Sequence, residues 1–195
     1  YSISVDENQA MNTPIGDPLT TTDQDTPDTP QTISYELSVE GIEFGFVLDS
    51  DTAQLSLGLA DMLNYEAQAK SEYDLVYWAT DSTGLNTTCS VSVTVLNIND
   101  APVISGNSAT VAEMSVEGTV VNVGVVGSDE DFGDVLTYSL SYGGAGVLPF
   151  AINADSAVLT VTDPTGLNFE DSALDAYTFT LIATDSAGAQ DSVEV

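Results

Sequence analysis

The stretch EYDLVYWATDSTG, residues 72–84, returns as AYTFTLIATDSAG at residues 176–188, an offset of 104 residues. At the same offset, MLNYEA at 62–67 is answered by GLNFED at 166–171. Nearer the N-terminus, VDENQAMN at 5–12 is answered by VAEMSVEG at 111–118, an offset of 106 residues. Self-similarity at a nearly fixed period indicates a repeated structural unit, and 195 residues are enough for two such units.

The joint between the two repeats is LNINDAP, residues 96–102, which follows a run of alternating Val and polar residues. Two asparagines, an aspartate and a proline end that run, because proline has no N–H to donate to a sheet. We therefore expect a first domain at 1–98 and a second at 99–195. The second repeat stops just before a counterpart of the joint, so we expect the sequence to be cut from a longer array.

Each repeat consists of short runs in which apolar and polar residues alternate, separated by Gly, Pro, Asp and Asn. Period-2 alternation is typical of half-buried strands, and regular turn signals between short strands are typical of a sandwich. We predict an all-β chain of two tandem seven-stranded Greek-key β-sandwiches, with no convincing helix. The clearest expected strands are TISYEL (32–37), AQLSL (53–57), YDLVYWA (73–79), SVSVTV (90–95), LTYSL (136–140), AVLTV (157–161), YTFTLIA (177–183) and DSVEV (191–195).

The charge of the chain is unusual: 31 Asp and Glu stand against one basic residue, Lys70, for a net charge of -30. Binding to nucleic acid or to an anionic membrane needs Lys or Arg, so neither partner is expected. No apolar run of about 18 residues predicts insertion into a membrane. The single cysteine, Cys89, forms no internal disulfide and is expected as a small core residue of its strand. Clustered carboxylates without basic partners must be solvated, screened or bound to metal ions.

The acids recur in the same order in both repeats: a Glu in the first strand, an Asp-x-Asp, an Asn-x-Glu and an Asp closing Ala-x-Asp. With the NINDAP joint, this order resembles that of cadherin repeats, and in particular of bacterial cadherin-like proteins. The resemblance covers nearly the whole chain and implies a cadherin-like or immunoglobulin-like sandwich. In order, the acids are Glu7, Glu113; Asp23, Asp25, Asp129, Asp131; Asn64, Glu66, Asn168, Glu170; and Asp81, Asp185.

Carried over position by position, the resemblance implies a calcium cluster at the joint. Calcium takes six to eight oxygen ligands in flexible geometry, which suits this mixture of carboxylates, amides and backbone carbonyls. About two to three ions are expected, with dissociation constants of roughly 0.1 to 1 mM. Ordinary turn residues with Asx-turns are the alternative interpretation of these acids. The implied ligands are Glu7, Asn64, Glu66, Asn97, Asn99, Asp100, Asp129, Asp131 and Asp185.

The remaining acids would form half-sites that face further repeats. Asp23, Asp25 and Asp81 would face an upstream repeat, and Glu113, Asn168 and Glu170 a downstream one.

The resemblance predicts a calcium-stiffened spacer or adhesion segment of a larger secreted or surface protein, extracellular and bacterial, whose partners are other cadherin-like repeats. The alternative is a polysaccharide-binding accessory module, because Trp78 is expected on the outer face of its strand, where an aromatic ring stacks on a sugar or packs under a loop. The inward face of that strand should hold Tyr73, Leu75, Tyr77 and Ala79. No His and no nucleophile motif is present, so an enzyme is not expected.

Overall fold

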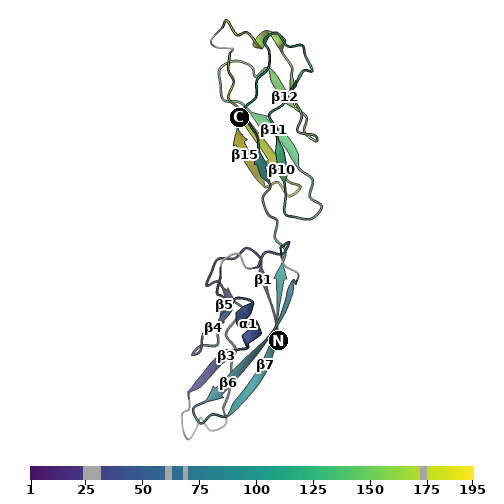
Figure 1. Cartoon of the computed structure of the whole chain (residues 1–195). Helices are drawn as coiled ribbons and strands as arrows, with labels where there is room; N and C mark the ends of the chain where they lie inside the picture. Colours follow the sequence, from purple (N-terminus) through teal and green to yellow (C-terminus); the bar gives the residue numbers. More distant parts are fainter. Residues whose placement is uncertain (24–31, 60–62, 68–69, 172–174) are drawn as a thin grey trace. The chain divides into compact units, whose positions relative to one another are not determined.

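The computed structural model describes residues 1–23, 32–59, 63–67, 70–171 and 175–195. It separates into two compact units, Tyr1–Ile98 and Asn99–Val195. Both units are built almost entirely of β-strands, which confirms the predicted all-β sandwich class (Figure 1). Among the described residues, no helix has the length and apolar character needed to cross a bilayer.

Unit 1 contains seven strands within its described residues, in two sheets. The four-stranded sheet has the order β1-β7-β6-β3, with β1 parallel to β7 and the other neighbours antiparallel. The three-stranded sheet has the order β2-β5-β4. The strands are β1 (Ser2–Asp6), β2 (Pro14–Ile15), β3 (Ile33–Leu37), β4 (Phe46–Leu48), β5 (Leu55–Leu57), β6 (Glu72–Asp81) and β7 (Asn86–Leu96).

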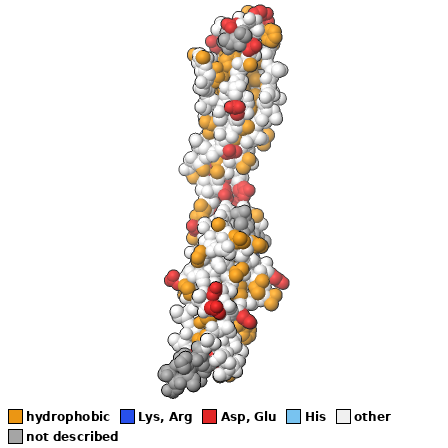
Figure 2. Space-filling view, turned by 90° about the vertical axis from the view of Figure 1, so that its left-hand side faces the viewer, with side chains coloured by type: hydrophobic (Ala, Val, Ile, Leu, Met, Phe, Trp, Pro, Cys, Tyr) orange, Lys and Arg blue, Asp and Glu red, His pale blue; other side chains and the backbone are white. Residues whose placement is uncertain are grey.

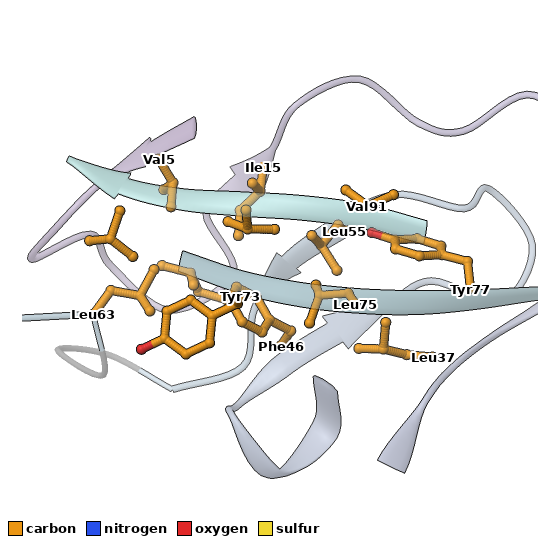
Figure 3. Packing of buried hydrophobic residues seen from close by; sticks show 13 residues of the cluster. Val5, Ile15, Leu37, Phe46, Leu55, Leu63, Tyr73, Leu75, Tyr77 and Val91 are labelled. Atoms are coloured by element: carbon orange, nitrogen blue, oxygen red, sulfur yellow. The ribbon is translucent and has the colours of Figure 1, made fainter. Parts of the chain in front are cut away.

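The core of unit 1 lies between these sheets and follows the predicted alternation (Figure 3). Along β6, Tyr73, Leu75 and Tyr77 are only 3%, 0% and 3% exposed, while Trp78 is 42% exposed. The Tyr73 ring packs edge-on against Phe46 at 5.4 Å between centroids. Each fully buried apolar side chain contributes roughly 1.5 to 3 kcal/mol, so this face of β6 secures the sandwich.

Two local expectations for unit 1 are wrong. Cys89 is exposed, as are all of the first five residues of β7, Asn86–Ser90. The chain also forms one short helix, α1 (Val39–Glu43), between β3 and β4. Five residues are too few to display a helical period of 3.6, so the sequence pattern does not reveal it.

Unit 2 contains eight strands within its described residues, in three small sheets of orders β10-β8, β11-β14-β15 and β12-β13-β9. Its core includes Leu159, Leu181 and Ala183, which are at most 1% exposed. The strands are β8 (Val103–Ser105), β9 (Val120–Val121), β10 (Val126–Ser128), β11 (Thr137–Ser141), β12 (Phe150–Ile152), β13 (Leu159–Val161), β14 (Thr180–Thr184) and β15 (Gln190–Glu194), with a single 3-10 turn, η1 (Pro164–Gly166).

Three predicted strands of unit 2 begin later than expected. LTYSL was expected from residue 136 but β11 begins at Thr137, and AVLTV was expected from residue 157 but β13 begins at Leu159. YTFTLIA was expected as a strand from residue 177, but β14 begins at Thr180. The ladder between β14 and β15 continues as far as Phe179 and Val195, which exchange two backbone hydrogen bonds of 3.0 Å. Ala176 and Thr178 form no hydrogen bond with any described residue, so regular strand structure is not seen there.

Candidate metal centre

Glu7 follows the end of β1 and is the most buried acid of unit 1, with 1% of its surface exposed. Its Oε1 accepts a hydrogen bond from the Ile98 N–H at 2.8 Å. Its Oε2 accepts one from the Tyr65 N–H at 2.5 Å. The carboxylate therefore holds together the end of β1, the loop at 63–67 and the last residue of the unit.

The second acid at this end of unit 1 is Glu66, which is half-buried. Its Oε1 accepts a hydrogen bond from Asn97 Nδ2 at 2.8 Å. One carboxylate oxygen of Glu66 lies within 4.8 Å of one of Glu7. The neighbouring Asn64 turns its Oδ1 to the Ala67 N–H. Unit 1 thus brings two carboxylates and two amide side chains to the loop and linker where it ends.

Unit 2 begins with two linker residues that bond to its own acids. Asn99 Nδ2 donates to Asp185 Oδ2, and the Asp100 N–H donates to Asp131 Oδ2, both at 2.8 Å. The Asp131 N–H in turn donates to Asp129 Oδ1 at 2.9 Å. The first two residues of the unit are therefore tied to the acidic loop after β10 and to the end of β14.

Asp185 is 5% exposed and accepts hydrogen bonds on both carboxylate oxygens. The side-chain bond from Asn99 is the main cause that holds the pKa of Asp185 below its usual 3.8. Desolvation opposes this shift, and the N–H groups of Ala189 and Gly188 support it. The carboxylate is thus kept ionised by donors that recognise its charged form.

One acid of this centre escaped the sequence prediction. Carboxylate oxygens of Asp129, Asp131 and Asp134 lie within 4.8 Å of one another. Asp134 also accepts hydrogen bonds from the N–H groups of Val135 and Ser186. The signal was present in the sequence, because DQDTPD at 23–28 is answered by DEDFGD at 129–134, and both runs end in Asp.

The donor set in unit 2 fits a hard cation. Two carboxylates about 5 Å apart repel each other by about 1 kcal/mol in bulk water and by several kcal/mol at lower dielectric. The sequence of unit 2 contains no Lys, Arg or His to offset that repulsion. Asp129 Oδ2 is buried and accepts no hydrogen bond from any described residue. Oxygen ligands without nitrogen or sulfur suit calcium rather than zinc or copper.

The one basic side chain of the chain lies elsewhere. Lys70 Nζ is 5.1 Å from the centroid of the Phe44 ring, a cation–π arrangement. Figure 2 shows acidic side chains in red on both units. The buried Glu7 carboxylate therefore accepts hydrogen bonds from backbone N–H groups, whereas Lys70 makes a cation–π contact with Phe44.

The two described half-site residues of unit 1 lie in one region. Asp23 and Asp81 line the same small cavity near the start of β7. Burial raises the pKa of Asp81, but bonds from Thr83, Leu85 and Gly84 outweigh it and leave the pKa below 3.8. Asp25 lies outside the described residues.

The half-site residues of unit 2 are all exposed, unlike their counterparts in unit 1. Glu113 Oε2 accepts a longer hydrogen bond from the Phe169 N–H, at 3.3 Å. Asn168 Oδ1 accepts one from the Glu170 N–H at 3.2 Å. Glu113 is exposed while its counterpart Glu7 is buried, so the repeat in sequence does not give the same environment twice.

Comparison with known proteins finds cadherin domains among the relatives of this chain. Residues 1–96 match the cadherin domain. Chicken (Gallus gallus) Cadherin-1 is 31% identical over 158 residues, which make up 75% of this chain and 17% of that protein. Human (Homo sapiens) Protocadherin gamma-A6 is 33% identical over 125 residues, 62% of this chain and 13% of that protein. The chain therefore spans less than a fifth of the length of these relatives.

Solved structures agree on the fold. Extracellular cadherin domains 3-6 of Protocadherin Gamma B2 match with a TM-score of 0.62 at 24% identity, over 100% of this chain and 44% of that one. A likeness at this level of identity shows the fold. Residues 1–96 match the cadherin domain, and the comparisons support cadherin repeats with a β-sandwich fold along the chain.

Proposed function

We propose that the chain is a calcium-binding tandem cadherin-like module, in which calcium bound around the linker 97–100 stiffens the joint between two repeats. The observation that carries the proposal is that each unit binds the linker residues next to it through hydrogen bonds to its own carboxylates. Unit 1 bonds Ile98 to the buried Glu7, and unit 2 bonds Asp100 to Asp131. Since Ile98 and Asn99 are consecutive residues, one peptide bond joins two acidic, oxygen-rich ends.

The proposed ligands supply charge and oxygen atoms in the proportions that calcium accepts. Their carboxylates repel one another when no cation is present, and a divalent ion reverses that repulsion. About two to three ions are expected, of which three would balance the six carboxylates inferred from the sequence, and Asp134 adds a seventh carboxylate. The ligands are Glu7, Asn64, Glu66, Asn97, Asn99, Asp100, Asp129, Asp131 and Asp185, with Asp134.

In this proposal the chain acts mechanically, as a spacer or adhesion segment of a longer extracellular or cell-surface protein. Its partners are other cadherin-like repeats of the same or another chain. A bacterial source stays a prediction from the NINDAP joint.

Two measurements test the proposal. Isothermal titration should show calcium binding in the 0.1 to 1 mM range, and small-angle scattering should show a narrower distribution of distances with calcium than with EGTA. Asp129→Asn with Asp131→Asn should weaken binding by about tenfold or more, since two charges leave the ligand set. The matched control is Glu40→Gln with Glu43→Gln, which removes two charges from exposed positions on α1. Scattering profiles that are identical with and without calcium would contradict the proposal.

A second candidate function rests on Trp78. Its side chain is 42% exposed on the outer face of β6, where an indole ring is available to stack on a sugar. Retention of the chain on an insoluble polysaccharide, lost in Trp78→Ala and kept in Val76→Ala on the same face, would favour a carbohydrate-binding module. No retention across a broad panel of glycans would argue against it.

A further inference from the structure

Four exposed apolar side chains form a patch over α1 and β4 of unit 1, here called the α1–β4 patch. Val39 and Ile42 of α1 are 71% and 60% exposed, Val47 of β4 is 50% exposed, and Leu59, two residues after β5, is 60% exposed. Figure 2 faces the side of unit 1 that carries β4 and β5, and hydrophobic side chains in orange gather there. Single apolar residues on a surface are ordinary, whereas a continuous group of them indicates a site of interaction.

Backbone contacts place the members of the patch beside one another. The two residues of α1 are three positions apart, so their side chains lie on the same side of the helix. The Gly45 N–H donates to the Ile42 carbonyl at 2.9 Å, and the Gly58 N–H donates to the Gly45 carbonyl at 2.7 Å. A Cβ at Gly58 would lie 2.6 Å from Cγ2 of Val47, so the Val47 side chain lies over the backbone next to Leu59.

The fold of the repeat does not require this patch, because unit 2 does not repeat it. The offset of 104 residues maps Val47 onto Ala151 and Leu59 onto Asp163. The segment of unit 2 that corresponds to α1, between β11 and β12, has the sequence YGGAGVLP and forms no helix. The exposed apolar side chains are therefore a property of unit 1 alone and call for a role other than folding.

The charges around the patch favour a basic partner. Glu40 and Glu43 are exposed on α1, next to the apolar side chains in the sequence. The chain contains no Arg or His, and the Nζ of its one lysine, Lys70, is 5.1 Å from the centroid of the Phe44 ring, directly after α1. The end of α1 thus accommodates an ammonium group. A second copy of the chain, with its net charge of -30, would instead add to the repulsion.

The size of the patch favours a short segment over a folded domain. The four exposed side chains offer an apolar area on the order of 400 Å², which is typical of a functional patch on a monomer. A stable complex of two folded proteins buries roughly 800 Å² of each partner. A segment with a few apolar side chains is enough to cover the smaller area.

We propose that the α1–β4 patch is a docking site for a segment of another protein that carries apolar side chains flanked by Lys or Arg. The apolar side chains of that segment pack on the patch, and its basic side chains pair with Glu40 and Glu43. None of these residues belongs to the proposed calcium ligands, so the docking site does not depend on the calcium proposal.

The test uses a fluorescently labelled peptide, KLKVKLK, in which lysine alternates with apolar residues. The matched control peptide is KSKTKSK, which has the same charge. Fluorescence anisotropy with the full chain, in calcium and about 0.15 M salt, should show KLKVKLK bound about tenfold more tightly or better. Hydrogen exchange of peptides that cover 39–48 should slow with KLKVKLK and stay unchanged with KSKTKSK. Equal binding of the two peptides would overturn the proposal, because net charge would then account for it.

The variant that tests the apolar contacts is Val47→Ala with Leu59→Asp, which introduces the residues that unit 2 has at these positions and so suits the fold. It should weaken binding of KLKVKLK by about tenfold or more, although the new carboxylate attracts lysine. The matched control is Val126→Ala with Val147→Asp in unit 2, where both valines are also exposed. This control should leave binding unchanged, and equal affinities of the two variants would overturn the proposal.

A second pair of variants tests the acids of α1. Glu40→Gln with Glu43→Gln should weaken binding of KLKVKLK by about threefold, and Glu117→Gln with Glu194→Gln, which removes two exposed charges from unit 2, should weaken it less. Equal losses would contradict the pairing with the acids of α1.

The oligomeric state distinguishes the proposed partner from a second copy of the chain. Sedimentation should show a monomer for the wild type in calcium. If the wild type instead forms a dimer that Val47→Ala with Leu59→Asp abolishes, the patch belongs to a second copy and the proposed basic segment is wrong.

Discussion

The Ile98 N–H donates to Oε1 of Glu7 at 2.8 Å, which fixes the last residue of unit 1 to an acid at the end of its first strand. Residues 7 and 98 are far apart in the sequence, and the bond is shielded from solvent, because Glu7 is only 1% exposed. A buried carboxylate that accepts from two backbone N–H groups is costly to remove, because both donors lose their partner. Glu7 therefore has a structural role in unit 1 in addition to the metal-binding role proposed for it.

We expect Glu7→Ala to destabilise unit 1 even without calcium. The N–H groups of Ile98 and Tyr65 would lose their acceptor, and an unsatisfied buried donor costs about 1 to 3 kcal/mol. The free energy of unfolding in EDTA, measured by urea denaturation, should fall by about that amount.

Its control comes from the other repeat. Glu113 is the counterpart of Glu7 but is exposed, with one hydrogen bond of 3.3 Å. Glu113→Ala should therefore change the unfolding free energy by about 0.5 kcal/mol or less. Equal losses of unfolding free energy in Glu7→Ala and Glu113→Ala would show that the burial of Glu7 is not the cause of its contribution to stability.

Calcium should stabilise the folded chain by mass action. With a dissociation constant of roughly 0.1 to 1 mM, about 10 mM calcium should add about 1.4 to 2.7 kcal/mol for each ion bound only by the folded state. Differential scanning calorimetry in calcium and in EGTA should show the corresponding rise in Tm. Magnesium at the same concentration is the control, since its stricter octahedral geometry suits these ligands less well. An equal rise with both ions would indicate charge screening alone.

Acid should weaken unit 2 through Asp191. The Ile104 N–H, which donates to Asp191 at 2.9 Å, is the main cause that lowers the pKa of Asp191 below 3.8, with the Ser192 N–H second. A carboxyl group with a depressed folded pKa stabilises above its unfolded pKa, and this contribution disappears as the pH falls through the folded value. The difference in Tm between the wild type and Asp191→Asn should therefore be widest at neutral pH and narrow below about pH 4. A difference that does not vary with pH would contradict this role.

Salt should stabilise the calcium-free chain. A net charge of -30 makes the folded state repel itself, and monovalent ions screen that repulsion over a distance of about 10 Å at 0.1 M. In EDTA, Tm should rise as sodium chloride increases from about 0.01 to about 0.5 M. The rise should be smaller in saturating calcium, because the bound ions already neutralise part of the charge. A Tm that salt leaves unchanged in EDTA would show that the repulsion is too weak to matter.

Strand alternation was the most reliable guide to the fold. It predicted that Tyr73, Leu75, Tyr77 and Ala79 face the core and that Trp78 faces outward. The exposures confirm this for Tyr73, Leu75, Tyr77 and Trp78, whereas Ala79 is only half-buried. The prediction holds because successive side chains in a strand point to opposite faces of the sheet. Burial on the inward face of β6 runs from Tyr73 to Tyr77.

Where alternation failed, coverage by another element was missing. Cys89 pairs with Tyr77 across the ladder, yet its side chain is exposed. The alternation within a strand does not say how far the opposite sheet extends, so the prediction of a buried cysteine was wrong. The alternation of YTFTLIA predicted a strand from residue 177, but β14 begins at Thr180, and the backbone pairing with Val195 extends only to Phe179. Neither partner is encoded within the segment itself.

The candidate site was predicted in part. The order of the acids pointed to the residues around the linker, and within each unit the structure brings together Glu7 with Glu66 and Asp129 with Asp131. Asp134 was missed, although the matching runs at 23–28 and 129–134 both end in Asp; in the structure a carboxylate oxygen of Asp134 lies within 4.8 Å of one of Asp131. The assignment of these groups to calcium remains a prediction.

Lys70 is the only residue of the sequence after which trypsin-like proteases cleave. Trypsin and related enzymes cleave after Lys or Arg, and this sequence offers them a single peptide bond, between Lys70 and Ser71. The same acid-rich composition that favours calcium therefore leaves the chain almost without targets for a whole class of digestive and secreted proteases. One cut there would separate residues 1–70, with β1 to β5, from β6 and β7, so a single cleavage would divide the unit 1 sandwich between two fragments.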